Sequence, residues 1–531
     1  MRARSIFVSL LIIICASISC NGRNNIVGKV SCEGKGIKGV VVSDGISTVQ
    51  TDSRGRYKMH SEKENGYVFI SMPSGYEAER DGIIPRHFVR LEGMKTDKAD
   101  FNLKKVNQSD CRIIVATDIH MTGDKRDKDL EQFHKTFYPD IVKTASTSDK
   151  PVYSVFLGDM STDSKWYVNS FGLPEYLDLM KDYPSAVFHI MGNHDNERKG
   201  EGSDWDQIGE STYKKVIVPN YYSFNIGDVH FMMLDNIVTY GPQPKGTPKG
   251  KFNFGTDYGF NYFIDSTQVE WMKKDLSYIS SDTPLIVCMH VPLYYGREPC
   301  SDGFVAYVKA NTSQDMNQFM SMFERFGNVH FLFGHQHRTQ TFETEKGRTH
   351  HIIGSASAVS WKLHDNNAPI VCSDGTPGGY QIFDISGKEI SWQFKSSAAA
   401  VEHSQMYVYD LNTIPAEYGG EPGSDNLLIN IFNWDPAWDI KVYENGHEIE
   451  VCKKSCHDPL YTKIRTETRQ LGNRPTAFRP TMSYHMFRSK RSHPDSEIKV
   501  VVTDRFGNTY TPASCPKSCK PSTSTSSTSR A

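Results

Sequence analysis

The sequence predicts an α/β protein, in which a central layered α/β domain carries a β-rich domain on each side. Near-continuous apolar runs alternate with helical patterns from about residue 110 to 395. Shorter runs of alternating apolar and polar residues lie before this block, at 24–107, and after it, at 403–512. A chain of 531 residues also exceeds one ordinary domain of roughly 100–200 residues. Three domains are therefore expected.

The first 20 residues have the pattern of a signal peptide. Arg2 and Arg4 precede an apolar run at 6–16, and small residues at 17–19 precede Cys20. The run is shorter than the roughly 20 apolar residues that span a bilayer. The small residues before Cys20 resemble a bacterial lipoprotein cleavage site, which implies a lipid on Cys20 and a place in the bacterial cell envelope, on the periplasmic or the outer side. A plain secretory peptide with a chance cysteine is the alternative.

Residues 24–107 predict a small β-sandwich. Short strands with regular Gly and Asp turn signals are typical of that architecture. The strings "GVVVSDG" and "TDSRGRY" resemble the carboxypeptidase-regulatory-like or transthyretin-like fold. The block contains no catalytic motif, so we expect it to be a spacer or interaction module.

The central block, 110–395, contains five apolar runs that each end in polar residues: "CRIIVATDIH", "VYSVFLGD", "AVFHIMGNHD", "LIVCMHVP" and "VHFLFGHQH". Such runs are typical of strands buried on both faces of a sheet. Helical patterns at 130–145, 268–279 and 316–326 separate them. In sheets of this kind the ligand site forms where strands end and loops begin.

The polar residues at these five strand ends predict a metal site. They are Asp118, His120, Asp159, Asn193, His194, Asp195, His290, His335 and His337. Oxygen and imidazole ligands suit Mn, Fe, Zn or similar divalent ions. Preceding glycines let the backbone approach a metal closely. One cluster alone would be a structural histidine or an Asx turn, but five successive clusters favour metal binding.

Residues 403–512 return to short strands and predict the second β-rich domain. Cys452 and Cys456, and likewise Cys515 and Cys519, are paired by spacing. They are candidates for disulfides of undetermined connectivity, with structural zinc as the alternative. The tail at 513–531 is rich in Ser and Thr, and we expect it to be disordered.

The five motifs together resemble those of the calcineurin-like metallophosphoesterase family, whose pattern runs D-x-H, G-D, G-N-H-D/E, H, G-H-x-H. The flanking β-domains resemble the bacterial three-domain form, as do "GSASAVSW" at 354–361 and "SDGTPGGY" at 373–380. The resemblance implies a central two-sheet α/β sandwich. More residues separate His120 from Asp159 than is usual in this family, and we interpret the additional residues as an inserted loop and helix.

The resemblance also implies a role for each motif residue. A first ion would be held by Asp118, His120 and His337. A second would be held by Asn193, His290 and His335, and Asp159 would bridge the two. Such a pair clamps a phosphoryl group and supplies a metal-bound hydroxide for in-line attack. His194 would contact the phosphoryl oxygens or protonate the leaving group. Asp195 would orient the metal ligands without binding a metal itself.

The substrate is less closely defined. Tyr294, Tyr295 and Trp361 either pack the core or give flat surfaces for an organic group, and Arg297 would pair with a phosphate oxygen. These residues favour a phosphodiester slightly over a monoester, of nucleotide, glycan or lipid origin. With a formal net charge of −2, the chain has no strong overall electrostatic field that would attract nucleic acid, and no nucleic-acid-binding patch is evident.

Two alternatives remain open from the sequence. The first is a non-catalytic, lipid-anchored binding protein on the same fold, which the complete ligand set disfavours. The second is a hydrolase of another ester class, such as sulfate esters.

Overall fold

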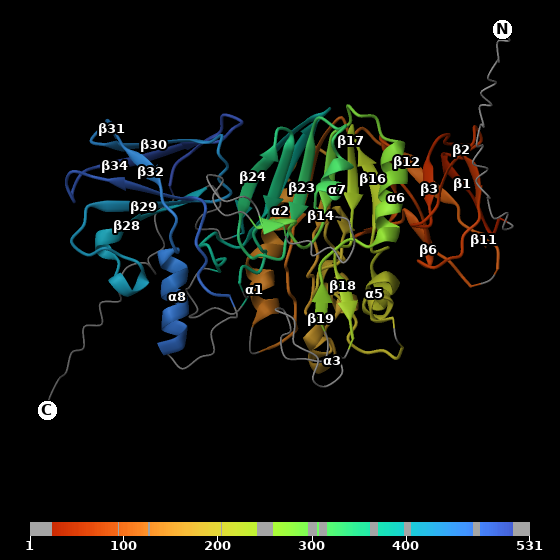
Figure 1. Cartoon of the computed structure of the whole chain (residues 1–531), viewed down its shortest axis with the longest axis horizontal. Coiled ribbons are helices and arrows are strands. Elements are labelled where there is room, and N and C mark those ends of the chain that lie inside the picture. The colour runs from red at the N-terminus through yellow and green to blue at the C-terminus, as the bar shows by residue number, and fades with distance from the viewer. Residues whose placement is uncertain are drawn as a thin grey trace, which may run out of the picture.

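The computed structural model describes residues 24–93, 95–125, 128–202, 204–241, 259–295, 305–306, 316–359, 361, 370–397, 405–470 and 478–512. Cys20, Arg297, Cys515, Cys519 and the predicted tail lie outside these ranges. The chain forms three bodies in a row, with the central α/β domain between an N-terminal and a C-terminal β-domain (Figure 1). The fold is thus the predicted α/β sandwich with β-rich flanks.

The N-terminal domain is a sandwich of two sheets. The larger sheet contains β11 (Asp97–Lys98), β1 (Ile26–Cys32), β12 (Phe101–Lys105), β7 (Tyr76–Ala78), β2 (Lys35–Gly36) and β5 (Arg56–Met59). The smaller contains β10 (Phe88–Arg90), β6 (Tyr67–Ile70), β3 (Val41–Ser43) and β4 (Thr48–Gln50). A hairpin of β8 (Arg80–Asp81) and β9 (Ile84–Pro85) projects from it.

This sandwich is joined to the central domain by one continuous apolar core. Its Ile83 carbonyl accepts the N–H of Val187, and its Met72 carbonyl accepts the N–H of Asn225, both at 2.8–2.9 Å. Burying apolar surface contributes roughly 25 cal/mol per Å². The N-terminal domain is therefore packed against the central domain through a shared core rather than tethered beside it.

The central domain has two mixed sheets. The five-stranded sheet runs β15 (Ala186–His189), β14 (Val152–Phe156), β13 (Asp110–Ala116), β26 (Gly379–Ser386), β27 (Glu389–Ser396). The six-stranded sheet runs β16 (Tyr222–Ile226), β17 (Val229–Met233), β20 (Leu285–Cys288), β23 (Val329–Phe333), β25 (Arg348–Ile352), β24 (Gln340–Glu345). The inner strands β17, β20, β23 and β25 are mutually parallel and fully buried, which explains the largely apolar sequences of the first three. Strand β25 is equally buried but has the polar sequence Arg-Thr-His-His-Ile.

Helices cover these sheets and surround the strand ends. They are α1 (Asp129–Lys135), α2 (Phe137–Ser146), α3 (Trp166–Asn169), α4 (Leu173–Met180), α5 (Trp205–Val216), α6 (Ser266–Ser277) and α7 (Met316–Ser321). The helix predicted over 130–145 is two helices with a break at Thr136. Pro139 lacks the N–H for a bond to Lys135 and would crowd its carbonyl, so it is accommodated in the first turn of α2.

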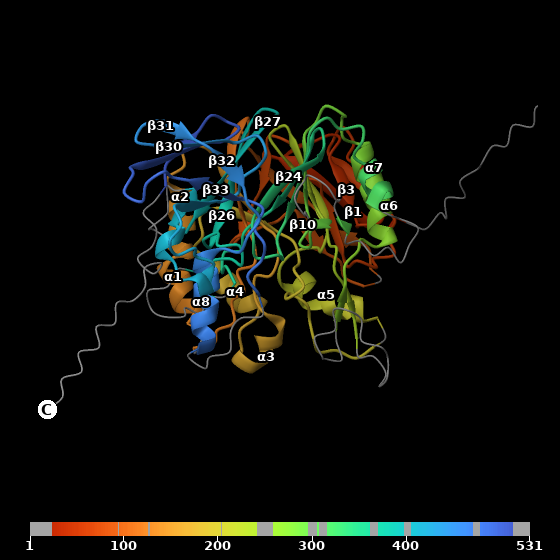
Figure 2. The same ribbon diagram turned by 60° about the vertical axis from the view of Figure 1, so that its left-hand side comes forward.

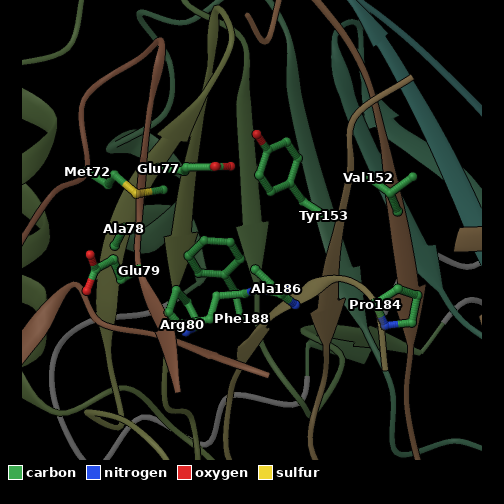
Figure 3. A pocket seen from close by; sticks show the side chains of 11 residues that line it. Met72, Glu77, Ala78, Glu79, Arg80, Val152, Tyr153, Pro184, Ala186 and Phe188 are labelled. Atoms are coloured by element: carbon green, nitrogen blue, oxygen red, sulfur yellow. The ribbon is translucent and has the colours of Figure 1, made fainter. Parts of the chain in front are cut away.

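Short strand pairs extend the central domain, with β18 (Val238–Tyr240) against β19 (Gly259–Asn261) and β21 (Tyr294–Tyr295) against β22 (Val305–Ala306). A cavity of about 240 Å³ lies between the N-terminal and central domains (Figure 3). Glu77 and Met72 line it from one side, and Val152 and Tyr153 from the other. These last two residues begin β14, so the cavity lies at the opposite end of that strand from the predicted site.

The C-terminal domain stacks two four-stranded sheets. One contains β28 (Met406–Asp410), β29 (Asn426–Ile431), β33 (Met486–Lys490) and β32 (Val451–Lys453). The other contains β31 (His447–Ile449), β30 (Asp439–Glu444), β34 (Ile498–Thr503) and β35 (Thr509–Tyr510). Helix α8 (Pro459–Gln470), which the sequence did not predict, lies below the two sheets of the C-terminal domain in both views (Figures 1 and 2).

Cys452 and Cys456 are free thiols and are not bonded to each other, while Cys515 and Cys519, the other candidates for disulfides, lie outside the described ranges. Cys452 is exposed on β32 opposite Arg488, whereas Cys456 lies in an isolated bridge to Ser483. Within the ranges given above, no helix is long and apolar enough to cross a membrane.

Candidate metal centre

The predicted ligands converge where five strands end. Strands β13, β14 and β15 of one sheet and β20 and β23 of the other each stop within a few residues of a ligand. The ligands they position are Asp118, His120, Asp159, Asn193, His290, His335 and His337. The site therefore lies between the edges of the two central sheets, as parallel strand ends predict.

The first group of ligands is Asp118, His120 and His337. The Nε2 atoms of His120 and His337 are 3.0 Å apart, and Asp118 Oδ1 lies 3.3 Å from the latter. Asp118 Oδ2 accepts hydrogen bonds from Thr117 and from the N–H of His335, but the buried Oδ1 has no hydrogen-bond partner among the described residues. A carboxylate oxygen without a donor beside two imidazole nitrogens fits a cation.

The second group is Asp159, His290 and His335, with Asn193 beside it. His290 Nε2 lies 3.2 Å from Asn193 Oδ1 and 3.3 Å from Asp159 Oδ2. The same Asp159 oxygen lies 3.5 Å from His120 Nε2 in the first group. One carboxylate oxygen therefore faces both groups, which is the position that a bridging ligand requires.

Hydrogen bonds from Nδ1 to backbone carbonyls fix the imidazole orientations of His290 and His337. His290 Nδ1 donates to the Leu157 carbonyl at 2.6 Å, and His337 Nδ1 donates to the Ala358 carbonyl. With the proton assigned to Nδ1, each Nε2 presents a lone pair to the site. A second hydrogen bond of this kind is typical of metal-binding histidines.

The backbone at the ligands is strained. Five of them have left-handed φ angles: Asp118 (54°), His120 (51°), Asp159 (54°), His335 (68°) and His337 (48°). Non-glycine residues rarely adopt this conformation, and it accumulates at functional sites because surrounding structure must impose it.

Three glycines allow the close approach. A Cβ on Gly192 would lie 2.1 Å from Asp159 Oδ1, and one on Gly334 would lie 1.9 Å from Thr117 Oγ1. A Cβ on Gly158 would lie 2.5 Å from the Gly192 nitrogen. These contacts are too short for any side chain, so the glycines that precede Asp159, Asn193 and His335 are sterically required.

The electrostatics keep the carboxylates charged. Burial would raise the pKa of Asp118 and of Asp159, but the adjacent histidines, led by His337 and His290 respectively, hold both pKa values below 3.8. Burial lowers the pKa of His335 to about 3 and keeps it neutral. Burial opposes protonation of His290, but Asp159 raises its pKa to about 9. A metal cation would replace that proton.

His194 lies at the open edge of the centre and is held by Asp163, a residue that the sequence analysis missed. His194 Nδ1 lies 3.0 Å from Asp163 Oδ1, and Arg198 donates to the other oxygen of Asp163. Burial would lower the pKa of His194, but Asp159 and Asp163 raise it to about 9. The only sequence signal was an acid four residues after Asp159.

Asp195 lies behind the ligands. Its two oxygens accept the backbone N–H groups of Asp159 (2.7 Å), Gly192 (2.9 Å), Met160 (3.1 Å) and Ser161 (3.3 Å). It therefore ties together the two loops that carry Asp159 and Asn193. This placement supports a positioning role.

Of the four predicted substrate residues, the structure describes the side chains of Trp361 and Tyr294. Trp361 is only 3% exposed, packs against Phe133 and Phe137, and donates its indole N–H to the Ile119 carbonyl. Of the two roles expected for Trp361, the structure shows core packing, because its ring lies beneath the Asp118–His120 loop. Tyr294 packs edge-on against His350. Tyr295 is described only as backbone of β21, and Arg297 lies outside the described residues.

Two other aromatic rings contact the ligands. Phe478 stacks on His337 with ring centroids 4.3 Å apart and an interplanar angle of 29°. Tyr262 meets His335 edge-on at 5.4 Å. Neither lies in a recognisable motif, and Phe478 reaches the centre from the C-terminal domain, so sequence spacing gave no signal for them.

The donor set fits two divalent ions. Each group combines imidazole nitrogens with carboxylate or amide oxygens, a mixture that suits borderline and harder divalent metals. Asp118 Oδ1 and Asp159 Oδ2 are the charged oxygens that would neutralise the ions.

Comparison with known proteins gives three family-model matches in chain order. Residues 24–106 match the N terminal of Calcineurin-like phosphoesterase, 111–339 match Calcineurin-like phosphoesterase, and 350–510 match the C terminal of Calcineurin-like phosphoesterase. The third match begins inside β25, so it includes β26 and β27 of the central sheet. A search of curated protein sequences found no match.

Several solved structures are similar to the chain. A dimetal phosphatase from Danio rerio is 12% identical (TM-score 0.35), covering 54% of this chain and 96% of that one. A 5'-nucleotidase from Candida albicans is 12% identical (TM-score 0.29), covering 55% of this chain and 52% of that one. An NAD nucleotidase from Haemophilus influenzae is 9% identical (TM-score 0.28), covering 54% of this chain and 50% of that one.

Proposed function

Because the chain belongs to the calcineurin-like phosphoesterase family over most of its described length, we propose that this metal-dependent phosphoesterase acts preferentially on phosphodiesters at a two-ion centre. The observation that carries the two-ion proposal is the position of Asp159 Oδ2, 3.5 Å from His120 Nε2 and 3.3 Å from His290 Nε2. Asp118, His120 and His337 would hold one ion. Asn193, His290 and His335 would hold the other.

When bound, two divalent ions supply Lewis acidity for the phosphoryl oxygens and an activated water for in-line attack. The protein's own contribution to proton transfer is His194. Asp163 accepts the Nδ1 proton and stabilises the imidazolium, which leaves the proton on Nε2 for the leaving-group oxygen. General acid catalysis of this kind typically contributes about 10²–10⁴-fold.

The diester preference is supported by the aromatic rings beside both ligand groups. Phe478 stacks on a histidine of the first group and Tyr262 contacts a histidine of the second. A phosphodiester carries an organic group on each side of the phosphorus, and aromatic faces bind such groups. Nucleotide, glycan and lipid diesters share this feature.

The test compares bis(4-nitrophenyl) phosphate with 4-nitrophenyl phosphate, using Mn²⁺-loaded protein. The proposal expects a higher kcat/KM for the diester. A clear preference for the monoester would contradict it and leave the phosphoesterase assignment intact. Sulfate-ester turnover exceeding both would instead favour another ester class.

We also propose that the chain is exported and anchored in the bacterial cell envelope through a lipid on Cys20. The charged, apolar and small-residue segments before Cys20 support this, although they lie outside the described residues. Lipid chains contribute about 0.8 kcal/mol of membrane affinity per buried CH₂. Cys20→Ala should therefore move the protein from the membrane to the soluble fraction, and continued membrane association would contradict the proposal.

A further inference from the structure

The C-terminal domain reaches the metal centre through Phe478. Its ring lies nearly parallel to the imidazole of His337, with centroids 4.3 Å apart. The Nε2 atom of the same imidazole faces His120 across 3.0 Å. An aromatic side chain from a different domain therefore stands directly beside a ligand of the first ion.

The backbone that carries Phe478 is held on both sides. Its carbonyl accepts hydrogen bonds from the Tyr461 hydroxyl (3.0 Å) and from Arg465, both on α8. Three residues later, Thr481 donates its N–H to the Ser373 carbonyl at 3.1 Å. Ser373 in turn donates its N–H to the His337 carbonyl at 3.2 Å. The backbone at Phe478 is thus held in place before a substrate arrives, which lowers the entropic cost of ordering this segment on binding.

Support of His337 does not account for this ring. The His337 imidazole is already oriented by the bond from its Nδ1 to the Ala358 carbonyl. Phe478 is also partly exposed, unlike the buried Trp361 that packs beneath the neighbouring ligand loop. A preorganised and partly exposed aromatic ring next to a phosphoryl site is suited to contact a flat organic group.

We propose that Phe478 is a specificity-determining residue, whose ring packs against an aryl or similarly flat group attached to the substrate phosphorus. The C-terminal domain then takes part in substrate selection instead of only flanking the catalytic domain. The inference rests on the proposed phosphoesterase centre, but it holds for a monoester or a diester substrate.

The experiment measures binding, so it does not depend on which ester is hydrolysed. Phenylphosphonate and methylphosphonate are titrated by calorimetry into the Mn²⁺-loaded full chain, and the ratio of their Kd values is compared between wild type and Phe478→Leu. The preference for the phenyl compound should fall by about 2- to 10-fold in the variant, as expected for one aromatic contact. Methylphosphonate affinity and metal content should stay unchanged.

Two variants serve as matched controls. Phe506→Leu makes the same change at a 39% exposed ring of the C-terminal domain that packs on Trp392, and it should leave the ratio unchanged. Phe478→Tyr keeps the aromatic face and should retain the wild-type ratio.

Either of two results would overturn the proposal. An unchanged ratio in Phe478→Leu would show that the ring does not contact the organic group. Loss of metal from that variant would show that the ring supports His337 instead. If Phe478→Leu does not fold, Phe478→Met removes the aromatic face and keeps a long apolar side chain, and an unchanged ratio there would equally overturn the proposal.

Discussion

At the scale of single residues, each side chain of the centre has one defined task. Asp159 faces both ligand groups, Asp195 holds two loops by four backbone N–H groups, and Asp163 holds His194. The motifs at the five strand ends predicted the candidate ligands, and three of these, Asp159, Asn193 and His335, directly follow a glycine. Asp163 and Phe478 could not be predicted in this way, since their contacts depend on how loops from different segments fold together.

His194→Ala should leave both ions bound and reduce turnover by about 10²-fold or more, as expected for loss of a general acid. The loss should be smaller for good leaving groups such as nitrophenolate, which need no proton. Turnover of nitrophenyl and alkyl esters and metal content per chain check this. An equal loss on both kinds of ester would mean that His194 only positions the phosphoryl group.

Asp163→Asn should shift the alkaline limb of the kcat–pH profile toward lower pH. The negative Asp163 beside His194 raises the pKa of the imidazole, and a general acid is active only below its pKa. Removing an adjacent opposite charge typically lowers such a pKa by about 1–3 units. The check is a pH profile with a poor leaving group, and an alkaline limb that stays in place would exclude His194 as the titrating acid.

At the scale of elements, the strand-to-loop junctions determine whether the centre forms. The apolar runs predicted the buried strands, and the glycines predicted close backbone approach. Helix boundaries were less accurate, because Pro139 divides one predicted helix and because α8 is stabilised by packing within the C-terminal domain. Periodicity alone does not report such tertiary effects.

Gly334→Ala should empty the first ion site. The new Cβ would lie 1.9 Å from Thr117 Oγ1 and 2.7 Å from Asp118 Oδ2, so the ligand loop must move. A displacement of about 1 Å can cost about 10²-fold in rate. Gly327→Ala is the matched control, because a Cβ there meets no atom within 4 Å. Normal metal content and turnover in Gly334→Ala would show that the loop tolerates the shift.

At the scale of the whole molecule, hydrogen bonds with the C-terminal domain stabilise the loop that follows His337. Asp374 accepts the N–H of Thr339 at 2.7 Å and pairs with His485 at 3.0 Å, and His485 also contacts Asn430. The order of the three domains could be predicted, because a block of apolar runs and helical patterns lies between two blocks of short alternating strands. This buried polar contact between domains could not, since its four members lie in four separate segments of the chain.

Asp374→Asn should destabilise the protein, with an effect that depends on pH. Burial opposes ionisation of Asp374, but its bond from His485 lowers the carboxyl pKa below 3.8. A lowered pKa stabilises the fold above the unfolded-state value of about 3.9, and this contribution is lost as pH falls below it. Hydrogen bonds to a charged group contribute about 1.5–3 kcal/mol.

The measurement is the urea midpoint of metal-free protein at neutral pH and below pH 4. The difference between wild type and Asp374→Asn should be largest at neutral pH and should shrink in acid. Asp282→Asn, at an exposed surface pair with Lys388, should change neither midpoint measurably. A difference of equal size at both pH values would show that the Asp374 charge does not contribute.

The central claim, a two-ion centre bridged by Asp159, is tested most directly by metal stoichiometry. Metal-depleted wild type, Asp159→Ala and the control Asp163→Asn are each equilibrated with Mn²⁺, freed of unbound ion and analysed for metal and turnover. Wild type and Asp163→Asn should retain about two ions per chain, whereas Asp159→Ala should lose both ions and activity, because one carboxylate serves both. One ion or fewer in wild type, or two ions with normal turnover in Asp159→Ala, would contradict the account.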